Sequence, residues 1–289
     1  MLNVTIVDVS GWKEDVYDAS GSRTKWWLIN PDGVKFVFKI PKGTHGSLSI
    51  GENYSEFLAY KLGTQLFNLK IPEIKFAVRN GVQGVISKNF IDKKYEFLEI
   101  SDYFQEFNLD FNTEHLPHYK LSIALKIMDK FSMLQNFFEM CIFDILIANQ
   151  DRHCENWGIL KEIKKGEFEF APLYDNGSSL GCYLTEARIQ NCLGDERAFN
   201  GFNNRAYTIF TIKDVERPKI SMFIEELISH DKPIFERAFS KFSIINYDSI
   251  YKVINIGEDN FFTKSRKEFI IKLIISRVNL INKFLLKGD

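Results

Sequence analysis

The sequence has little cysteine, and its four cysteines are not spaced as pairs. They are Cys141, Cys154, Cys182 and Cys192. None of them forms the CxxC spacing that is typical of zinc sites and redox pairs. Disulfide bonds are rare in reducing compartments, where cysteines stay as thiols. We therefore expect reduced thiols in a cytoplasmic protein.

The chain also lacks a secretory start, a long uncharged apolar run and an excess of charge of one sign. Its first residues have no basic start followed by a sustained apolar stretch, which argues against a signal peptide. The densest apolar segments, 121–149 and 268–287, are interrupted by charges every few positions, so they predict buried helices rather than membrane spans. Lys and Arg (37) balance Asp and Glu (38), so we expect no direct nucleic-acid partner and no membrane partner.

Several catalytic signatures are absent as well. The chain contains no Walker motif, no full glycine pattern of protein kinases and no GxSxG nucleophile elbow. The histidines do not form a set with metal-ligating spacing. These absences argue against a P-loop enzyme, a serine hydrolase of the elbow type and a histidine-based metalloenzyme.

The first third of the chain predicts strands and one helix. Residues 25–30 and 35–40 are short aromatic and β-branched runs around a Pro-Asp-Gly turn, and a second hairpin is expected around Asn80 and Gly81. Residues 54–67 have apolar side chains at helical intervals, with Asn53 as a candidate cap.

From about residue 120 the pattern becomes helical. We expect helices over 121–148, 213–229, 233–240 and 262–286. A chain of 289 residues has room for two lobes. The predicted fold class is therefore α+β, with a β-rich lobe over residues 1–97, a helical lobe over 98–289 and the junction within 92–104.

The polar stretch 149–158 is the candidate catalytic loop. Asp151 and Asn156 have four residues between them, as in the protein-kinase catalytic loop, and Asp175 follows in an Asp-Asn-Gly sequence. A carboxylate beside a hydroxyl can position it and accept its proton, while an amide oxygen and a second carboxylate can hold Mg²⁺ on a triphosphate. Asp151 taken alone also fits the capping of a turn. His153 is expected to support the loop by hydrogen bonds, although a buried structural histidine fits equally well.

A second group of candidates lies upstream. Lys39 ends a strand-like run, where its ammonium can reach phosphate oxygens, and Glu56 on the predicted helix is a suitable partner. A lysine at a strand end is otherwise an ordinary solvated edge residue. Small residues around Gly21 can bring backbone N–H groups close to phosphates, although a plain surface turn fits the same letters.

Together these residues resemble the HipA-like serine/threonine kinases, in particular the kinase core found in compact members. The matching stretches are SGSRTK, Lys39, SEFLAYKLG, NQDRHCEN and YDNGSSLG, which run in family order up to residue 181. The Asp-Arg-His sequence and the following Asn also resemble the catalytic loop of phosphatidylinositol 3/4-kinases. The phosphate-loop stretch lies so near the start that we expect no extra N-terminal domain like that of longer members.

The resemblance implies a two-lobed protein-kinase-like fold and an ATP- and Mg²⁺-dependent serine/threonine protein kinase. ATP would lie between the lobes near residues 95–100. Asp151 would be the catalytic base, supported by His153. The implied residues at the nucleotide are Ser20, Gly21, Ser22, Lys25, Lys39 and Glu56, with Asn156 and Asp175 as the Mg²⁺ ligands.

The resemblance further implies regulation and partners. Family members can phosphorylate a phosphate-loop serine in themselves, which here is Ser20 or the neighbouring Ser22. An added phosphate would repel the ATP phosphates, which gives a physical reason for self-inactivation. The expected partners are a protein substrate, such as an aminoacyl-tRNA synthetase or another translation protein, and an antitoxin-like protein that restrains toxin-like activity.

Two other functions are compatible with the same residues. A lipid or small-molecule kinase positions phosphate and alcohol in the same way, although the near-neutral charge argues against a phosphoinositide substrate. A nucleotide-binding pseudokinase that acts through a partner is the third possibility.

Overall fold

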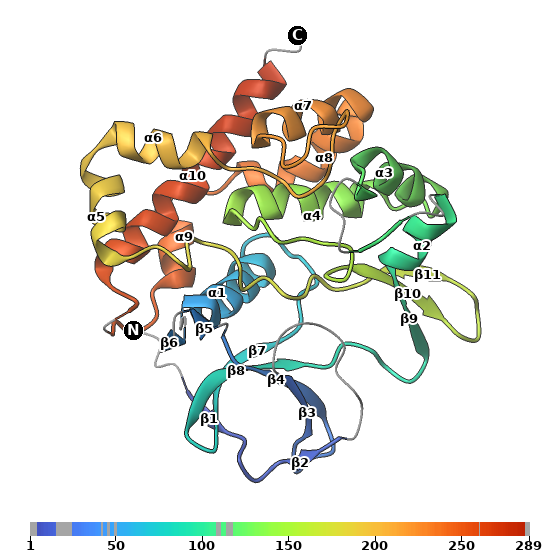
Figure 1. Ribbon diagram of the computed structural model, residues 1–289, viewed down its shortest axis with the longest axis vertical. Coiled ribbons are helices and arrows are strands. Elements are labelled where there is room, and N and C mark those ends of the chain that lie inside the picture. The colour runs from blue at the N-terminus through green and yellow to red at the C-terminus, as the bar shows by residue number, and fades with distance from the viewer. Residues whose placement is uncertain are drawn as a thin grey trace.

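In the described part of the chain, six strands form the sheet of the first lobe, which lies at the bottom of Figure 1. The computed structural model describes residues 5–15, 25–41, 43–44, 47–48, 51–107, 111–113, 118–259 and 261–286. The strand order is β1-β7-β8-β4-β3-β2, and every adjacent pair is antiparallel except β1 with β7. The strands are β1 (Val7–Asp8), β2 (Lys13–Glu14), β3 (Lys25–Ile29), β4 (Lys35–Lys39), β7 (Ile74–Arg79) and β8 (Val82–Lys88).

Both predicted hairpins are confirmed. Strands β3 and β4 pair around the turn that contains Gly33, and β7 and β8 pair around Asn80 and Gly81. Asn80 and Gly81 have φ angles of 48° and 80°, which is the left-handed backbone that a tight two-residue hairpin requires. The inward-facing Leu28 and Phe38 are buried in the small core of this lobe.

Helix α1 (Gly51–Gln65) lies between the sheet and the helices above it (Figure 1). The short pair β5 (Gly43–Thr44) and β6 (Ser47–Leu48) precedes it. The predicted helix is confirmed, but Asn53 is not its cap, because the helix begins two residues earlier and Asn53 is buried in its first turn. Gly51 permits this start, since a Cβ atom there would lie 2.1 Å from the carbonyl oxygen of Cys182.

A three-stranded sheet was not predicted. It has the order β11-β10-β9 and consists of β9 (Tyr95–Glu99), β10 (Gly158–Glu162) and β11 (Phe168–Phe170). Strand β9 lies in the segment expected to be only a junction, and it pairs along its whole length with β10. The predicted lobe boundary after residue 97 falls inside β9 and stays a prediction.

The helical lobe occupies the upper part of Figure 1. Its helices are α2 (Ile100–Phe107), α3 (Leu121–Lys130), α4 (Leu134–Ile147), α5 (Glu186–Gly194), α6 (Glu196–Asn204), α7 (Ile220–His230), α8 (Lys232–Ser243), α9 (Tyr247–Ile254) and α10 (Lys264–Leu286).

The single helix predicted over 121–148 is wrong in one respect, because Ser132 has a φ of 56° and separates α3 from α4. The helix predicted from 213 starts at Ile220, because residues 212–215 form a bridged turn. Helices were correctly predicted near α8 and α10, whereas α2, α5, α6 and α9 were not predicted.

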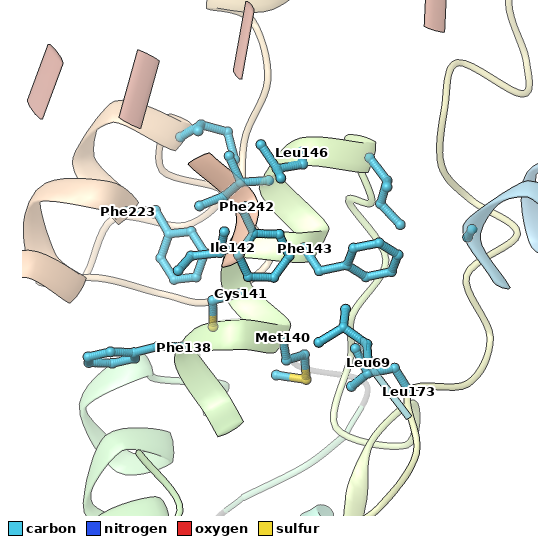
Figure 2. Close-up of a cluster of buried hydrophobic side chains, with 14 of the residues drawn as sticks. Leu69, Phe138, Met140, Cys141, Ile142, Phe143, Leu146, Leu173, Phe223 and Phe242 are labelled. Atoms are coloured by element: carbon cyan, nitrogen blue, oxygen red, sulfur yellow. The ribbon is translucent and has the colours of Figure 1, made fainter. Parts of the chain in front are cut away.

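Helix α4 is the centre of the main core. Every residue from Phe137 to Ile147 is buried, as expected for a helix that is apolar on all sides and enclosed by others. Figure 2 shows Phe138 and Phe223 on one side of α4, and Leu69 and Leu173 on the other. Each such side chain stabilises the fold by about 1.5–3 kcal/mol when fully buried.

The described helices include none that is both long and apolar enough to span a membrane. The cysteines Cys141, Cys154, Cys182 and Cys192 are all free and buried.

Candidate active site

The candidate catalytic loop begins where α4 ends in a left-handed residue. Ala148 has φ 53° and ψ 41°, and the next backbone N–H, from Asn149, donates to the carbonyl of Asp144 at 2.9 Å. The Asn149 side chain also donates to Asp144 Oδ1 at 2.9 Å, and its oxygen accepts the N–H of Asp151 at 3.1 Å. These bonds place Asp151 immediately beyond a rigid helix.

Asp151 and Asn156 close the loop on each other. Asn156 Nδ2 donates to the carbonyl of Asp151 at 2.8 Å, and the Asn156 N–H donates to the carbonyl of His153 at 2.9 Å. Asn156 is buried, whereas Asp151 is half-buried. The hydroxyl of Ser178, three residues beyond Asp175, donates to Asp151 Oδ2 at 3.4 Å. The loop is therefore closed, and the carboxylate of Asp151 lies next to the Asp175 segment.

The second group of predicted residues meets around Lys39. Lys39 Nζ lies 3.3 Å from Asp175 Oδ1 and 3.9 Å from Glu56 Oε1. The Lys39 side chain, at the end of β4, is only 14% exposed. Asp175 has a φ of 57°, a left-handed conformation that costs a non-glycine residue about 1–2 kcal/mol. Three segments far apart in sequence thus converge on one ammonium group.

Lys25 lies beside this group through strand pairing. In the β3–β4 register Lys25 is directly opposite Lys39, so both side chains lie on the same face of the sheet. Two cations directly opposite each other repel, and the carboxylates of Asp175 and Glu56 beside Lys39 offset that repulsion. The predicted phosphate-loop residues Ser20, Gly21 and Ser22 lie outside the described residues.

Arg152, to which no role was assigned from the sequence, connects the loop to its surroundings. Its Nε and Nη2 donate to the two carboxylate oxygens of Asp144 at 2.9 and 2.8 Å. Its Nη1 donates to the carbonyls of Asn156 and Tyr174 at 3.0 and 2.6 Å, and Nη2 also donates to Asn176 Oδ1 at 2.6 Å. One buried guanidinium therefore holds the end of α4, the candidate loop and both neighbours of Asp175.

Arg152 stays protonated although it is buried. Burial by itself lowers the pKa of a guanidinium, but the carboxylate of Asp144 outweighs it, and the pKa of Arg152 lies above its ordinary value. Tyr119 supports the same loop, since its hydroxyl donates to the Arg152 carbonyl at 3.1 Å and accepts from Trp157 Nε1 at 2.6 Å. One feature of the sequence could have indicated this network, because Asp144 is the one acidic residue in the otherwise apolar stretch 140–147 of α4.

The remaining residues of the loop differ in their surroundings. His153 is half-buried, and its Nδ1 accepts the N–H of Glu155 at 3.3 Å, so it is not a fully buried histidine. Its predicted support of the loop stays a prediction. Burial, with a smaller effect from Glu155, raises the pKa of the Cys154 thiol to about 12, so the thiol stays protonated and is a poor nucleophile or metal ligand.

Helix α1 is fastened to the Asp175 segment on its other side. Ser55 Oγ donates to the carbonyl of Ser179 at 2.8 Å, and Ser179 Oγ donates to the carbonyl of Asn176 at 2.7 Å. Because Ser55 precedes Glu56 in α1, this contact fixes the helix that supplies the partner of Lys39. Single serines carry no motif, so sequence reasoning did not find these contacts.

A cavity of about 290 Å³ opens beside Asp151. It is lined by Thr113, Gln150, Asp151, His153, Glu155, Tyr207, Ile209 and Arg217. Lys39 and Asp175 do not line this cavity, and a second molecule can approach the carboxylate of Asp151 there.

Comparison with known proteins agrees with this arrangement. A family model described as the HipA-like C-terminal domain matches residues 17–230. The serine/threonine-protein kinase CtkA of Helicobacter pylori (strain J99) is 24% identical over 255 residues, which cover 85% of this chain and 77% of that protein.

Solved structures show the same fold. The crystal structure of a proinflammatory kinase CtkA of Helicobacter pylori superposes with a TM-score of 0.78 at 18% identity, over 98% of this chain and 99% of the other. HipA of Shewanella oneidensis MR-1, solved with HipB and operator DNA, superposes with a TM-score of 0.56 at 12% identity, over 95% of this chain and 69% of the other. The kinase-like fold predicted from sequence is confirmed.

Proposed function

The chain belongs to the family of HipA-like C-terminal domains, and on that premise we propose that it is an ATP- and Mg²⁺-dependent serine/threonine protein kinase. The observation that carries the proposal is the convergence of Lys39, Glu56 and Asp175, with Ser178 linking the same segment to Asp151. This is the arrangement in which a lysine, a metal-binding acid and a hydroxyl-positioning acid act on one phosphoryl group.

The strand-rich lobe supplies the cations for the triphosphate. Lys39 and Lys25, side by side on β4 and β3, offer two ammonium groups to phosphate oxygens. Glu56 orients Lys39 from an Nζ–Oε1 distance of 3.9 Å. The aromatic side chains of Phe90, Phe97 and Tyr174, whose ring centroids lie 5.5–6.0 Å apart, support an adenine site near the β9 segment.

The residues present fit a Mg²⁺ ion carried by the nucleotide. Asp175 offers a carboxylate and Asn156 an amide, and both are the hard oxygen ligands that Mg²⁺ takes. In the described part of the chain, no group of three or more His, Cys, Asp or Glu side chains is arranged to hold a metal by itself. Phosphate oxygens would therefore complete the coordination, and the bound ion would neutralise charge on the transferring phosphoryl group.

Asp151 would act on the acceptor. Its carboxylate lines the 290 Å³ cavity, where it would orient a serine or threonine hydroxyl and accept its proton as the oxygen bonds to the γ-phosphorus and ADP leaves. Arg152 donates to the carboxylate of Asp144 before this residue and to the carbonyl of Asn156 after it, so the base does not need to be ordered when substrate binds.

Finer features of the proposal come from the family. We propose autophosphorylation on Ser20 or Ser22, a translation protein such as an aminoacyl-tRNA synthetase as substrate, and action in the cytoplasm with toxin-like consequences. HipA of Shewanella oneidensis is part of a toxin–antitoxin system with HipB, which supports an antitoxin-like partner for this chain.

The test compares the wild type with Asp151→Ala for transfer of labelled phosphate from ATP to itself and to proteins of a cell extract. Loss of a positioned base slows transfer by about 10²–10⁴-fold, whereas Asp248→Asn, which removes an exposed carboxylate from α9, should change nothing. Nucleotide binding without transfer in the wild type would indicate a pseudokinase. Transfer to phosphoinositide vesicles but not to protein would indicate a lipid kinase.

A further inference from the structure

Arg217 lines the 290 Å³ cavity beside Asp151 and has an unusual backbone conformation. Its φ is 48°, and Lys213 and Asp214 in the same loop have φ angles of 48° and 63°. Three left-handed residues that are not glycine persist in one short loop only where the surroundings hold them, and such strain concentrates at binding sites.

The loop is held from several sides. The residues Ile212 and Val215 exchange backbone hydrogen bonds of 3.1 and 2.8 Å, and Thr208 N–H donates to the carbonyl of Pro218 at 3.1 Å. Ion pairs anchor its tip, with Lys120–Asp214 at 3.1 Å and Lys213–Glu226 at 2.8 Å. Each of the other charged side chains at the start of the loop therefore has a partner in the protein.

Arg217 is different. The described residues place no carboxylate within ion-pair distance of it, and its guanidinium lies over the ring of Tyr207, 5.5 Å from the ring centroid. A cation–π contact fixes the direction of a guanidinium and leaves its N–H groups available for an anion. Both Arg217 and Tyr207 line the cavity that contains Asp151.

The other charges at the cavity do not supply that anion. Glu155 Oε2 faces His153 Nδ1 at 3.7 Å, and Asp151 accepts from Ser178. Asp151 is also the group assigned to the acceptor hydroxyl. Arg217 is consequently an oriented, exposed cation beside the place where the acceptor must lie.

We propose that Arg217 determines acceptor specificity by binding an acidic group, a carboxylate or a phosphate, next to the serine or threonine that is phosphorylated. This inference rests on the proposed kinase function. The planar fork of arginine binds either anion in a bidentate manner, which lysine or glutamine does not reproduce. The loop conformation presents the fork before the substrate arrives.

The experiment uses the full chain on an extract of intact proteins whose own kinases have been inactivated. Phosphosites that require Asp151 are mapped for the wild type, Arg217→Gln and Arg205→Gln, with Asp151→Ala as background. Arg205 is an exposed arginine at the end of α6 that does not line the cavity, so Arg205→Gln makes the same charge change elsewhere. A second extract, treated with phosphatase, separates carboxylates from phosphates as the acidic group.

We expect acidic residues to be enriched beside the wild-type sites, and the preference for acidic over neutral acceptors to fall about tenfold in Arg217→Gln only. Loss of the enrichment after phosphatase treatment identifies a phosphate as the recognised group, and its retention identifies Asp or Glu. An unchanged motif in Arg217→Gln overturns the inference and leaves the kinase function intact. A basic motif beside the phosphosites that is lost in Glu155→Gln also overturns the inference. The inference is likewise overturned if the chain phosphorylates only itself. Absence of any Asp151-dependent site overturns the kinase function as well.

Discussion

At the scale of single residues, the candidate site residues are held in place by side chains to which no catalytic role is assigned. Lys39, Glu56, Asp151, Asn156 and Asp175 were identified from their order and spacing, and the structure brings them into two linked groups. The contacts that hold these residues in place could not be predicted from the sequence. Arg152 and Ser55 donate to backbone carbonyls and Ser178 donates to a carboxylate, and the tertiary fold sets these partners.

Arg152 gives a prediction about stability. Arg152→Met leaves the carboxylate of Asp144 buried without its cation, and breaking a buried pair in this way costs about 3–5 kcal/mol. The free energy of unfolding, measured in urea, should fall by that amount. The double variant Asp144→Leu/Arg152→Met removes both charges and should recover much of the loss.

A suitable control is Lys213→Gln, which breaks the more exposed pair with Glu226 and should change stability by about 0.5 kcal/mol or less. If Arg152→Met is as stable as the wild type, the guanidinium does not hold the loop, and the structural role given to it here is wrong.

At the scale of elements, turns defined by local residue preferences could be predicted from the sequence, whereas features set by tertiary contacts could not. The Asn80–Gly81 turn was predicted because both residues tolerate left-handed backbone. The break at Ser132 was missed because a serine in an apolar helical pattern gives no stop signal. In the structure the left-handed Ser132 ends α3, and the N–H groups of Ser132 and Met133 donate to the carbonyls of Asp129 and Met128 at 2.9 and 2.8 Å. Strand β9 was missed because its register is set by β10, more than fifty residues away.

Strand β8 supplies a prediction about the nucleotide site. Gly84 faces β4 so closely that a Cβ atom there would lie 2.3 Å from the carbonyl oxygen of Lys39. Gly84→Ala must therefore displace the strand end that carries Lys39, at a cost of about 1–3 kcal/mol in the free energy of unfolding. Because Lys39 is proposed to bind the triphosphate before and during transfer, the KM for ATP should rise.

The matched control is Gly201→Ala in α6, where no atom lies within 4 Å of the added methyl group. It should raise stability by about 0.5–1 kcal/mol, because alanine is favoured over glycine inside a helix. A Gly84→Ala protein with an unchanged KM for ATP would contradict the link between this strand pair and the nucleotide.

At the scale of the whole molecule, the helix of Glu56 belongs to both lobes. Tyr54 on α1 stacks on Phe261 and Phe262, with ring centroids 5.2 and 5.4 Å apart, just before α10. Arg266 on α10 donates to the carbonyls of Gly181 and Leu184 at 3.2 and 2.7 Å, which extends the same contact to the segment that follows Asp175. The two sides of the candidate nucleotide site are therefore braced by the C-terminal helix.

Because both lobes contribute residues to the candidate nucleotide site, we can predict how the ligand affects thermal unfolding. A ligand that binds only the folded chain, at a hundred times its Kd, stabilises it by about 2.7 kcal/mol. ATP with Mg²⁺ should raise the Tm by about 5 °C, as followed by calorimetry, since 1 kcal/mol is worth roughly 2 °C for a chain of this size. Lys39→Met should abolish most of the rise, and EDTA should reduce it. An equal rise in EDTA would show that the bound nucleotide does not need the metal.

The positions of the tryptophans, including Trp157 in its contact with Tyr119, give the two lobes separate fluorescence signals. The chain has four tryptophans, of which Trp12, Trp26 and Trp27 lie half-buried in the strand-rich lobe, while Trp157 is buried beside the candidate catalytic loop. Indole fluorescence shifts to longer wavelength when the ring meets water. A chain that keeps Trp157 as its one indole therefore emits at short wavelength for as long as the loop is folded, whatever the strand-rich lobe is doing.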